Sequence, residues 1–271
     1  DCPPWQLSAK EIKHDKKKKI ISYKSAWLKI YDTPVFYFPK FFHPDPTVKR
    51  QSGFLMPSFM DSTNLGSSFQ LPYYHAISNN KDFTVYPRLY ADKKLLLQSE
   101  YRQKNLDSNF VMDGSFVDKN NNSIKSHFFL NGSKNLDFDY FDETELNLRL
   151  EQVSGDNYLK AYKLKSPIIQ DSSTLKSSVG INANKEDLQL NLDFEVYENL
   201  SKKESDRYEY IFPSYTLVKQ FEENNSLNGN FALNSFGFIK NFDTNIYEKV
   251  VINDIIFNSN STITNEGLKN N

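Results

Sequence analysis

The sequence contains little cysteine, little glycine and no long apolar segment. Cys2 is the only cysteine among 271 residues, so no disulfide can close within the chain. The nine glycines do not form a phosphate-binding loop or a dinucleotide fingerprint. No segment approaches the roughly 20 apolar residues that a membrane-spanning helix needs. These absences argue against nucleotide-dependent enzymes and against helical membrane proteins.

Charge and titratable residues indicate no catalytic or metal site either. The formal net charge is −1 and the one basic run, residues 16–19, is expected to be a hairpin turn, so no nucleic-acid partner is predicted. No two carboxylates stand out as a catalytic pair. The histidines lack the spacing of zinc ligands; they are His14, His43, His75 and His127. We therefore predict a protein that is not an enzyme, without catalytic residues, metal or cofactor.

What the sequence does contain is alternation of apolar and polar residues. In the segment LQLNLDFEV, residues 188–196, every second residue is apolar, which gives a strand one apolar and one polar face. Clusters of Asn, Asp, Ser and Gly favour turns; they include 118–123, 131–135 and 182–187. Strands are expected between them, at 83–89, 95–103, 109–117, 123–131, 146–150, 175–183, 207–218, 228–239 and 248–258. We predict an all-β fold of antiparallel hairpins.

The expected strands run to about nine or ten residues, longer than is usual in soluble sheets and long enough to cross a bilayer in a barrel. A soluble β-sandwich alternates in the same way, so it remains an alternative. The apolar residues of one strand distinguish the two folds, because a barrel exposes them as a band and a sandwich buries them against a second sheet. These residues are Leu188, Leu190, Leu192 and Phe194.

The first 45 residues predict a separate small sheet, with strands at 5–12, 20–31 (broken near Ala26) and 35–38. Proline lacks a backbone donor, so the proline-rich segment that follows is expected to be a junction rather than an interior strand. Its prolines include Pro34, Pro39, Pro44 and Pro46. We place a domain boundary between residues 48 and 49. Because the chain begins Asp-Cys-Pro-Pro, we expect it to be a piece of a longer, processed protein.

Three motifs resemble a known family. They are HPDPTVKRQSGFLMPSF at 43–59, LPYYHAISNNKDFTVYPR at 71–88 and EYRQ at 100–103. Their order and spacing are similar to those of the LptD family of lipopolysaccharide-assembly outer-membrane proteins, in particular its alphaproteobacterial members. The similarity is specific through residues 5–103 and thinner from 104 to 200.

The resemblance implies an outer-membrane protein of a Gram-negative bacterium. Residues 1–48 are then the end of a periplasmic β-jellyroll, or OstA-like, domain, and residues 49–271 are the first part of an incomplete transmembrane β-barrel. The family receives lipopolysaccharide from an LptA-like periplasmic bridge protein and inserts it into the outer leaflet through a lateral gate. An LptE-like plug lipoprotein and the barrel-assembly machinery are the other implied partners.

The chain departs from the family in three ways: most of the jellyroll is missing, the barrel cannot close, and one cysteine remains of the pairs that link the two domains. By the resemblance, Cys2 is expected to form a disulfide with a cysteine outside this chain.

The resemblance also suggests functional residues. Pro57 and Pro72 are similar to prolines that weaken the lateral gate; the alternative is that they end strands at the membrane interface. Aromatic residues near the junction are expected to line the route of the acyl chains, with ordinary interdomain packing as the alternative; they are Phe36, Phe38, Phe41 and Phe42. Lys49 and Arg50 are expected to hold phosphates or, alternatively, to belong to a turn.

Two other functions remain open at this point. One is a general porin or a substrate-specific outer-membrane channel, which predicts no attached sheet domain. The other is a soluble β-sandwich that binds a lipid or a glycan.

Overall fold

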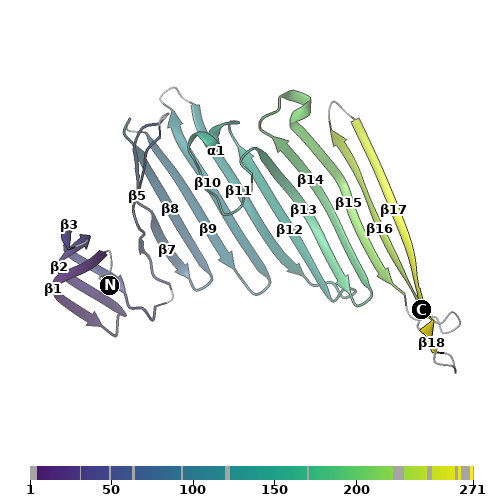
Figure 1. The fold of residues 1–271 in the computed structure, drawn as a ribbon, viewed down its shortest axis with the longest axis horizontal. Helices are drawn as coiled ribbons and strands as arrows, with labels where there is room; N and C mark the ends of the chain where they lie inside the picture. Colours follow the sequence, from purple (N-terminus) through teal and green to yellow (C-terminus); the bar gives the residue numbers. More distant parts are fainter. Residues whose placement is uncertain are drawn as a thin grey trace.

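The fold is all-β, as predicted. The computed structural model describes residues 5–30, 32–48, 50–62, 65–92, 94–119, 123–169, 171–221, 229–242, 246–259, 262–263 and 269–270. These residues form a three-stranded sheet, a 14-stranded sheet and a short pair of strands, β18 (Thr262–Ile263) and β19 (Lys269–Asn270) (Figure 1). The helical elements among them are α1 (Tyr158–Ala161) and the 3-10 helix η1 (Glu204–Arg207). No helix in this part of the chain is long and apolar enough to cross a membrane.

The small sheet has the order β1-β2-β3, formed by β1 (Trp5–Asp15), β2 (Ile20–Ile30) and β3 (Thr33–Pro44). Residues 16–19 form the expected turn. The break expected near Ala26 is a local irregularity within a continuous strand, because the register passes over Ser25, which has a φ of 50°. A jellyroll is not formed by the described residues, which contribute only these three antiparallel strands.

The third strand is longer than predicted. β3 continues beyond Phe38 to Pro44 and includes Pro39, so ending the strand at residue 38 was wrong. β3 lies at the edge of the small sheet, where one side of the backbone has no ladder to complete, and prolines are tolerated there. The expectation that this proline-rich segment is not an interior strand is therefore met.

The long sheet is an antiparallel meander. At the N-terminal edge of this sheet the strands are short: they are β4 (Gly53–Phe54), β5 (Ser58–Met60), β6 (Ser68–Gln70) and β7 (Tyr73–Ser78). The long strands follow as β8 (Lys81–Tyr90), β9 (Leu95–Lys104), β10 (Ser108–Lys119), β11 (Ser123–Leu136), β12 (Glu143–Val153), β13 (Thr174–Lys185), β14 (Leu188–Asn199), β15 (Tyr208–Gln220), β16 (Gly229–Phe242) and β17 (Ile246–Ser259).

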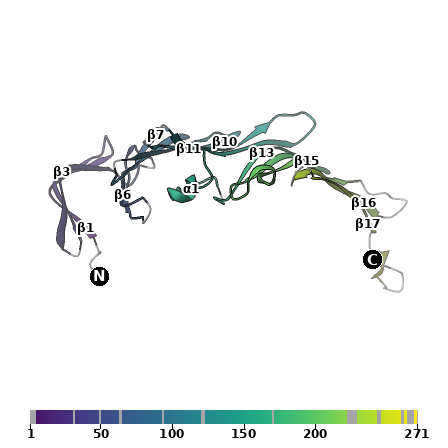
Figure 2. The ribbon, with the colours of Figure 1, turned by 90° about the horizontal axis from the view of Figure 1, so that it is seen from above.

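The long sheet is one curved layer that is open at both ends (Figure 2). Each strand contacts its ladder neighbours, and the terminal strands β5 and β17 do not pair with each other, so the described residues form no closed barrel. No second sheet packs on the strand that carries Leu190, Leu192 and Phe194, and Phe194 is 43% exposed. The arrangement lacks the two packed layers that define a sandwich.

Two predicted turns lie partly or wholly inside strands. β11 runs through residues 131–135 to Leu136, and β13 continues to Lys185. Glycine is needed at position 132, because a Cβ there would lie only 2.5 Å from the ring of Phe110 on the neighbouring strand. Asn131, Ser133 and Asn135 are compatible with a strand here because they lie on the polar face of the sheet, and Lys134 lies at the end of the opposite face, paired with Ser108 and Leu146.

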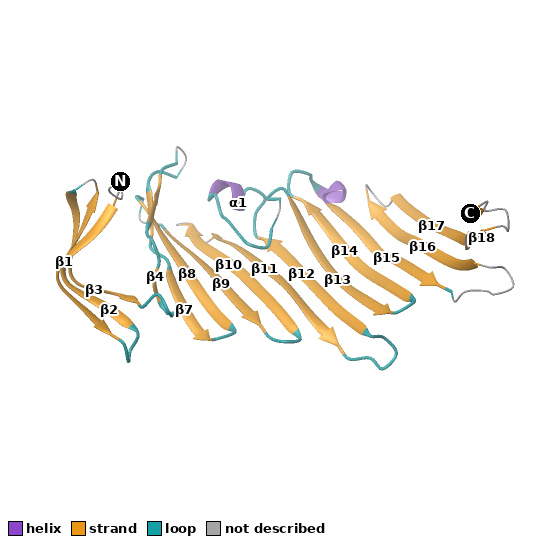
Figure 3. Cartoon of the chain, turned by 60° about the horizontal axis from the view of Figure 1, so that its bottom comes forward, coloured by secondary structure: helices purple, strands orange, loops and turns teal. Residues whose placement is uncertain are grey.

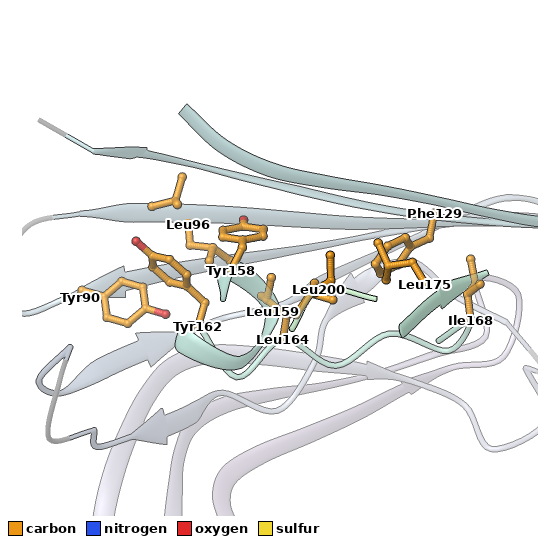
Figure 4. Packing of buried hydrophobic residues seen from close by; sticks show 11 residues of the cluster. Tyr90, Leu96, Phe129, Tyr158, Leu159, Tyr162, Leu164, Ile168, Leu175 and Leu200 are labelled. Carbon is orange, nitrogen blue, oxygen red and sulfur yellow. The ribbon is translucent and has the colours of Figure 1, made fainter. Parts of the chain in front are cut away.

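The buried core lies between one face of the long sheet and the segment that connects β12 to β13. We call residues 154–169 of this segment the strap; it contains α1 and folds back across the strands (Figure 3). Leu159 and Tyr162 of the strap pack with Leu96, Phe129 and other buried side chains from several strands (Figure 4). The core is therefore made by a loop covering a sheet, not by two sheets.

Candidate functional site

One face of the long sheet is apolar and uncovered. The register pairs Phe59 with Phe69, Phe69 with Leu89 and Leu89 with Leu95, and later Leu148 with Val179 and Val179 with Phe194. All are 36% exposed or more, as are the other large members of what we call the apolar face: Phe54, Tyr73, Phe116 and Phe128. A contiguous exposed surface of this extent marks contact with a membrane or with a partner protein.

The opposite face is polar, and the strap covers part of it. Asp82, Thr84 and Arg88 of β8 alternate with apolar residues and are buried, as are Gln98, Asp113, Ser115, His127 and Glu151 on the following strands. We call this the polar face. Burying polar groups costs free energy unless they are hydrogen-bonded, so their partners determine what the face can do.

A buried hydrogen-bond chain lies under α1. The Ser115 hydroxyl is 2.7 Å from His127 Nδ1 and 2.7 Å from the hydroxyl of Tyr158, while His127 Nε2 is 3.2 Å from Asp113 Oδ2. Gln98 donates to the Asp113 carboxylate at 3.1 Å. Burial raises the pKa of Tyr158 to about 12, so its hydroxyl stays protonated at neutral pH. Hydrolases also link serine, histidine and aspartate in this order. Here, however, Tyr158 covers the serine, and the hydrogen-bonded side chains hold the strap in place.

Three side chains of the polar face also bind backbone carbonyls of the strap. Arg88 Nη1 donates to Tyr162 at 2.9 Å, Gln98 to Lys165 at 2.7 Å and Arg149 Nη2 to Ile168 at 3.2 Å. Sequence analysis did not find these residues, because their partners lie 19 to 74 positions away in the chain. Within the described ranges, no three His, Cys, Asp or Glu side chains are grouped so that they could hold a metal ion.

Pro57 and Pro72 interrupt the first two strands of the long sheet. Pro57 lies between β4 and β5, and Pro72 lies between β6 and β7, so each expected strand is divided into two short pieces. Leu55 donates to the Pro72 carbonyl at 2.9 Å, which keeps the pieces in one sheet. The register changes by one residue between β4–β7 and β5–β6, which is a bulge at residue 56.

Three of the four aromatic residues predicted near the junction lie together. The ring centroids of Phe36 and Phe38 are 5.2 Å apart, and those of Phe38 and Phe41 are 5.5 Å apart. Phe42 follows Phe41 directly and pairs with Ser22, so strand alternation places it on the other face of the small sheet. The contact between Phe38 and Phe41, three positions apart, shows that the alternation shifts between them, where the register passes over Ser25 and Pro39. Phe36, Phe38 and Phe41 therefore share their face with Leu28, Ala26 and Tyr23, which makes that face apolar.

Arg50 is held by protein groups. Its Nε donates to the Tyr74 hydroxyl at 3.0 Å, Nη1 donates to the Asn79 carbonyl at 2.7 Å, and Nη2 pairs with the carboxylate of Asp82. This arrangement ties the junction to the start of β8 and occupies three of the five donors of the guanidinium. Lys49 and Cys2 lie outside the described residues.

Asp45 fixes the point where the chain leaves the small sheet. Its carboxylate accepts from the Thr47 hydroxyl at 2.6 Å and from the Thr47 backbone at 2.8 Å, and it pairs with His14. Its backbone nitrogen donates to the Lys19 carbonyl at 2.9 Å. The Thr47 bonds, followed by His14, lower the pKa of Asp45 from 3.8 to about 2.

Asp45→Asn is expected to destabilise, at neutral pH, the part of the small sheet where the chain leaves it. The pKa of Asp45 is lower in the folded protein, so the ionised carboxylate stabilises the fold above about pH 4, and this contribution is lost as the pH falls toward 2. Amide exchange in residues 13–24, corrected for intrinsic rates, should be faster in the variant at pH 7 and equal to wild type near pH 2. Asp32→Asn is the control, and a difference independent of pH would contradict the assignment.

Comparison with known proteins finds similarity to one family in part of the chain. The model of a family described as "LptD protein" matches residues 21–138. A protein of Nitrosococcus oceani named "LPS-assembly protein LptD" is 32% identical over 179 residues, which are 65% of this chain and 23% of that protein. Proteins with the same name from Ralstonia nicotianae and Pseudomonas putida are 38% and 34% identical over 120 and 128 residues.

The matches to these two proteins cover 43% and 46% of this chain and 15% and 14% of the relatives. The chain therefore spans less than a quarter of the length of these three relatives. The highest coverage, for the first of them, is 23%. The matched segment includes the small sheet from β2 onward, the interrupted strands at Pro57 and Pro72, and β8 to β11. Residues 21–138 are thus similar to the family described as "LptD protein", and the relatives that match are named LPS-assembly proteins.

Proposed function

We propose that this chain is the part of a lipopolysaccharide transport and assembly protein that joins a periplasmic domain to an outer-membrane barrel. The observation that carries the proposal is the polarity of the long sheet: its apolar face is exposed, and its polar face is partly covered by the strap. In a water-soluble sheet the polar face is exposed and the apolar face is covered, whereas barrel strands face lipid with their apolar side. Residues 1–48 then lie in the periplasm and residues 49–271 form the first part of the barrel of a Gram-negative bacterium.

In this function, lipopolysaccharide moves from an LptA-like bridge protein onto the apolar face of the small sheet. Phe36, Phe38 and Phe41 contact the acyl chains there, while Phe42 lies on the other face and is not part of this route. An LptE-like lipoprotein fills the completed barrel, and the barrel-assembly machinery inserts it. The disulfide of Cys2 with a cysteine outside this chain stays a prediction.

The lateral gate is placed at the interrupted strands. Pro57 and Pro72 remove backbone donors from the first two strands, where a barrel closes by pairing its first strand with its last. A weak seam lets the acyl chains leave sideways into the bilayer. Arg50 contributes to this region by anchoring the junction to Asp82, with two donors left for a phosphate.

Two alternatives are less well supported. A general porin or a substrate-specific channel has no attached sheet domain, whereas here the small sheet precedes the long one directly. A soluble β-sandwich that binds a lipid or a glycan needs a second packed layer, which the described strands do not have.

The test is to replace Pro57 and Pro72 together by alanine in the full-length protein. Restored backbone donors should strengthen the seam, so we expect less lipopolysaccharide at the cell surface at normal levels of assembled protein. Pro46→Ala, in a turn before the long sheet, is the matched control and should have no effect. Normal delivery by a normally assembled double variant would remove the gate role from these prolines.

A further inference from the structure

A third proline extends the line of weak points into the sheet. Leu71, next to Pro72, lies opposite Pro87 of β8, because Gln70 pairs with Arg88 and Tyr73 with Val85 on either side. Leu71 donates to the Pro87 carbonyl at 3.3 Å. The nitrogen and the carbonyl of one residue point to the same side of a strand, so residue 87 would be expected to donate back to the Leu71 carbonyl. Because Pro87 has no N–H, this second bond is missing.

The other two prolines lie at the same level of the sheet, one in a ladder and one at its edge. Leu55 donates to the Pro72 carbonyl at 2.9 Å, and the reciprocal bond is missing because Pro72 has no N–H. Pro57 lies opposite Leu71, whose own backbone groups face β8, so the nitrogen of Pro57 faces the open edge of the sheet. Two neighbouring ladders thus each lack one bond along this line, and the edge strand lacks a donor at the same level.

This line separates β5 and β6 from β4 and β7. We call β5 and β6 the distal half-hairpin. Its ladder to the rest of the sheet consists of Ser68, Phe69 and Gln70 paired with Tyr90, Leu89 and Arg88. This ladder of three pairs, extended by the bond from the Ala91 nitrogen to the Ser67 carbonyl at 2.9 Å, is short and lies next to a bulge and three prolines, so the distal half-hairpin can open at low cost.

Arg88 joins the distal half-hairpin to the strap. Its guanidinium is buried, with Nη2 donating to Gln70 Oε1 at 3.2 Å and Nη1 donating to the Tyr162 carbonyl at 2.9 Å. The Ser58 hydroxyl donates to the same Gln70 oxygen at 3.4 Å, which extends the bridge to β5. Leu65, in the turn after β5, packs against the buried cluster that contains Tyr162.

We propose that Arg88 is a positioning residue that couples the strap to the gate: β5 and β6 swing about the proline line when Arg88 releases Gln70. The proposal rests on the proposed function in that the moving edge is the seam through which lipid leaves. No carboxylate pairs with Arg88 among the described residues, so its charge is directed at two neutral acceptors, one in each element. Bonds to a charged donor are stronger than neutral ones, so this bridge adds a restraint on the distal half-hairpin beyond its ladder and ties it to the strap.

The test is hydrogen exchange, measured by mass spectrometry on the full-length protein in lipid nanodiscs. Loss of a charge-assisted hydrogen bond in Arg88→Met should speed exchange about tenfold or more in both β5–β6 and residues 158–164. Gln70→Leu should speed exchange in β5–β6 alone, and Gln70→Glu, which keeps the acceptor, should leave it unchanged or slower. Arg149→Met is the matched control: it frees Ile168 at the other end of the strap and should leave β5–β6 unchanged.

Unchanged exchange of β5–β6 in Arg88→Met would overturn the proposal, and so would additive effects of Arg88→Met and Gln70→Leu in the double variant, because one bridge can be broken only once. An equal increase in β9 would also overturn it, since that indicates general loosening. The measurement needs no lipopolysaccharide delivery. The coupling can therefore fail while the Pro57 and Pro72 variants still impair delivery, and the reverse can also occur.

Discussion

Leu148→Arg is expected to lower the stability of the protein in a membrane by about 2–4 kcal/mol. Leu148 lies near the middle of β12 on the apolar face, where it pairs with Val179 and is 36% exposed. A cation on the lipid side of a barrel strand costs about 2–4 kcal/mol at the bilayer midplane, whereas an exposed surface substitution in water changes stability by about 0.5 kcal/mol or less. The free energy of unfolding in lipid vesicles, from urea titration of the full-length protein, measures this difference.

Asn147→Arg is the matched control for Leu148→Arg. Asn147 is the neighbour of Leu148 but lies on the polar face, where its amide is 3.4 Å from Glu145 Oε2. An arginine there meets a carboxylate and water, so we expect a change below about 1 kcal/mol. Equal effects of the two substitutions would contradict the assignment of the apolar face to lipid.

Glu151→Leu is expected to cost about 3–5 kcal/mol, because it removes one partner of a buried ion pair. Glu151 Oε1 is 2.6 Å from Arg149 Nη2, and its other oxygen accepts the backbone N–H of Lys176 at 2.8 Å. The substitution leaves Arg149 without its carboxylate and also removes a bond between β12 and β13. Because Arg149 binds the strap at Ile168, the strap should become sensitive to protease at the same time.

The control for this variant is Glu145→Leu, on the same strand and the same face. Glu145 accepts a single long hydrogen bond from Asn147 at 3.4 Å, so we expect only a small loss of stability. The urea midpoint in lipid vesicles and the rate of cleavage within residues 154–169 provide the two measurements. A Glu151→Leu variant as stable as Glu145→Leu would show that the buried pair contributes little.

The polar face explains why a turn was wrongly predicted inside a strand. The cluster Asn-Gly-Ser-Lys-Asn at 131–135 was predicted to be a turn, but β11 continues through it. Asn131 pairs with Arg149, and Gly132 makes room for the ring of Phe110. In a sheet with one polar face, polar residues do not by themselves indicate a turn.

The interrupted strands were only partly predictable. The resemblance and the missing donor of proline pointed to Pro57 and Pro72, and short strands lie on either side of each, while their role in a gate stays a prediction. The alignment of Pro87 with them follows from the register of β6 and β7 on β8 and from the one-residue bulge at 56, and neither is encoded in any local pattern. The same holds for Phe41, which lies beside Phe38 although simple alternation over three positions would place them on opposite faces.

By itself the sequence determined the all-β class, the antiparallel meander and the apolar alternation of strands such as β14, since these depend on a period of two residues along one strand. Only the tertiary structure decided that the strap covers the polar face and that Arg88 connects it to Gln70. Residues 70, 88 and 162 come together through ladder register and loop packing. Such contacts join groups up to 74 positions apart in the chain, and no short-range period records them.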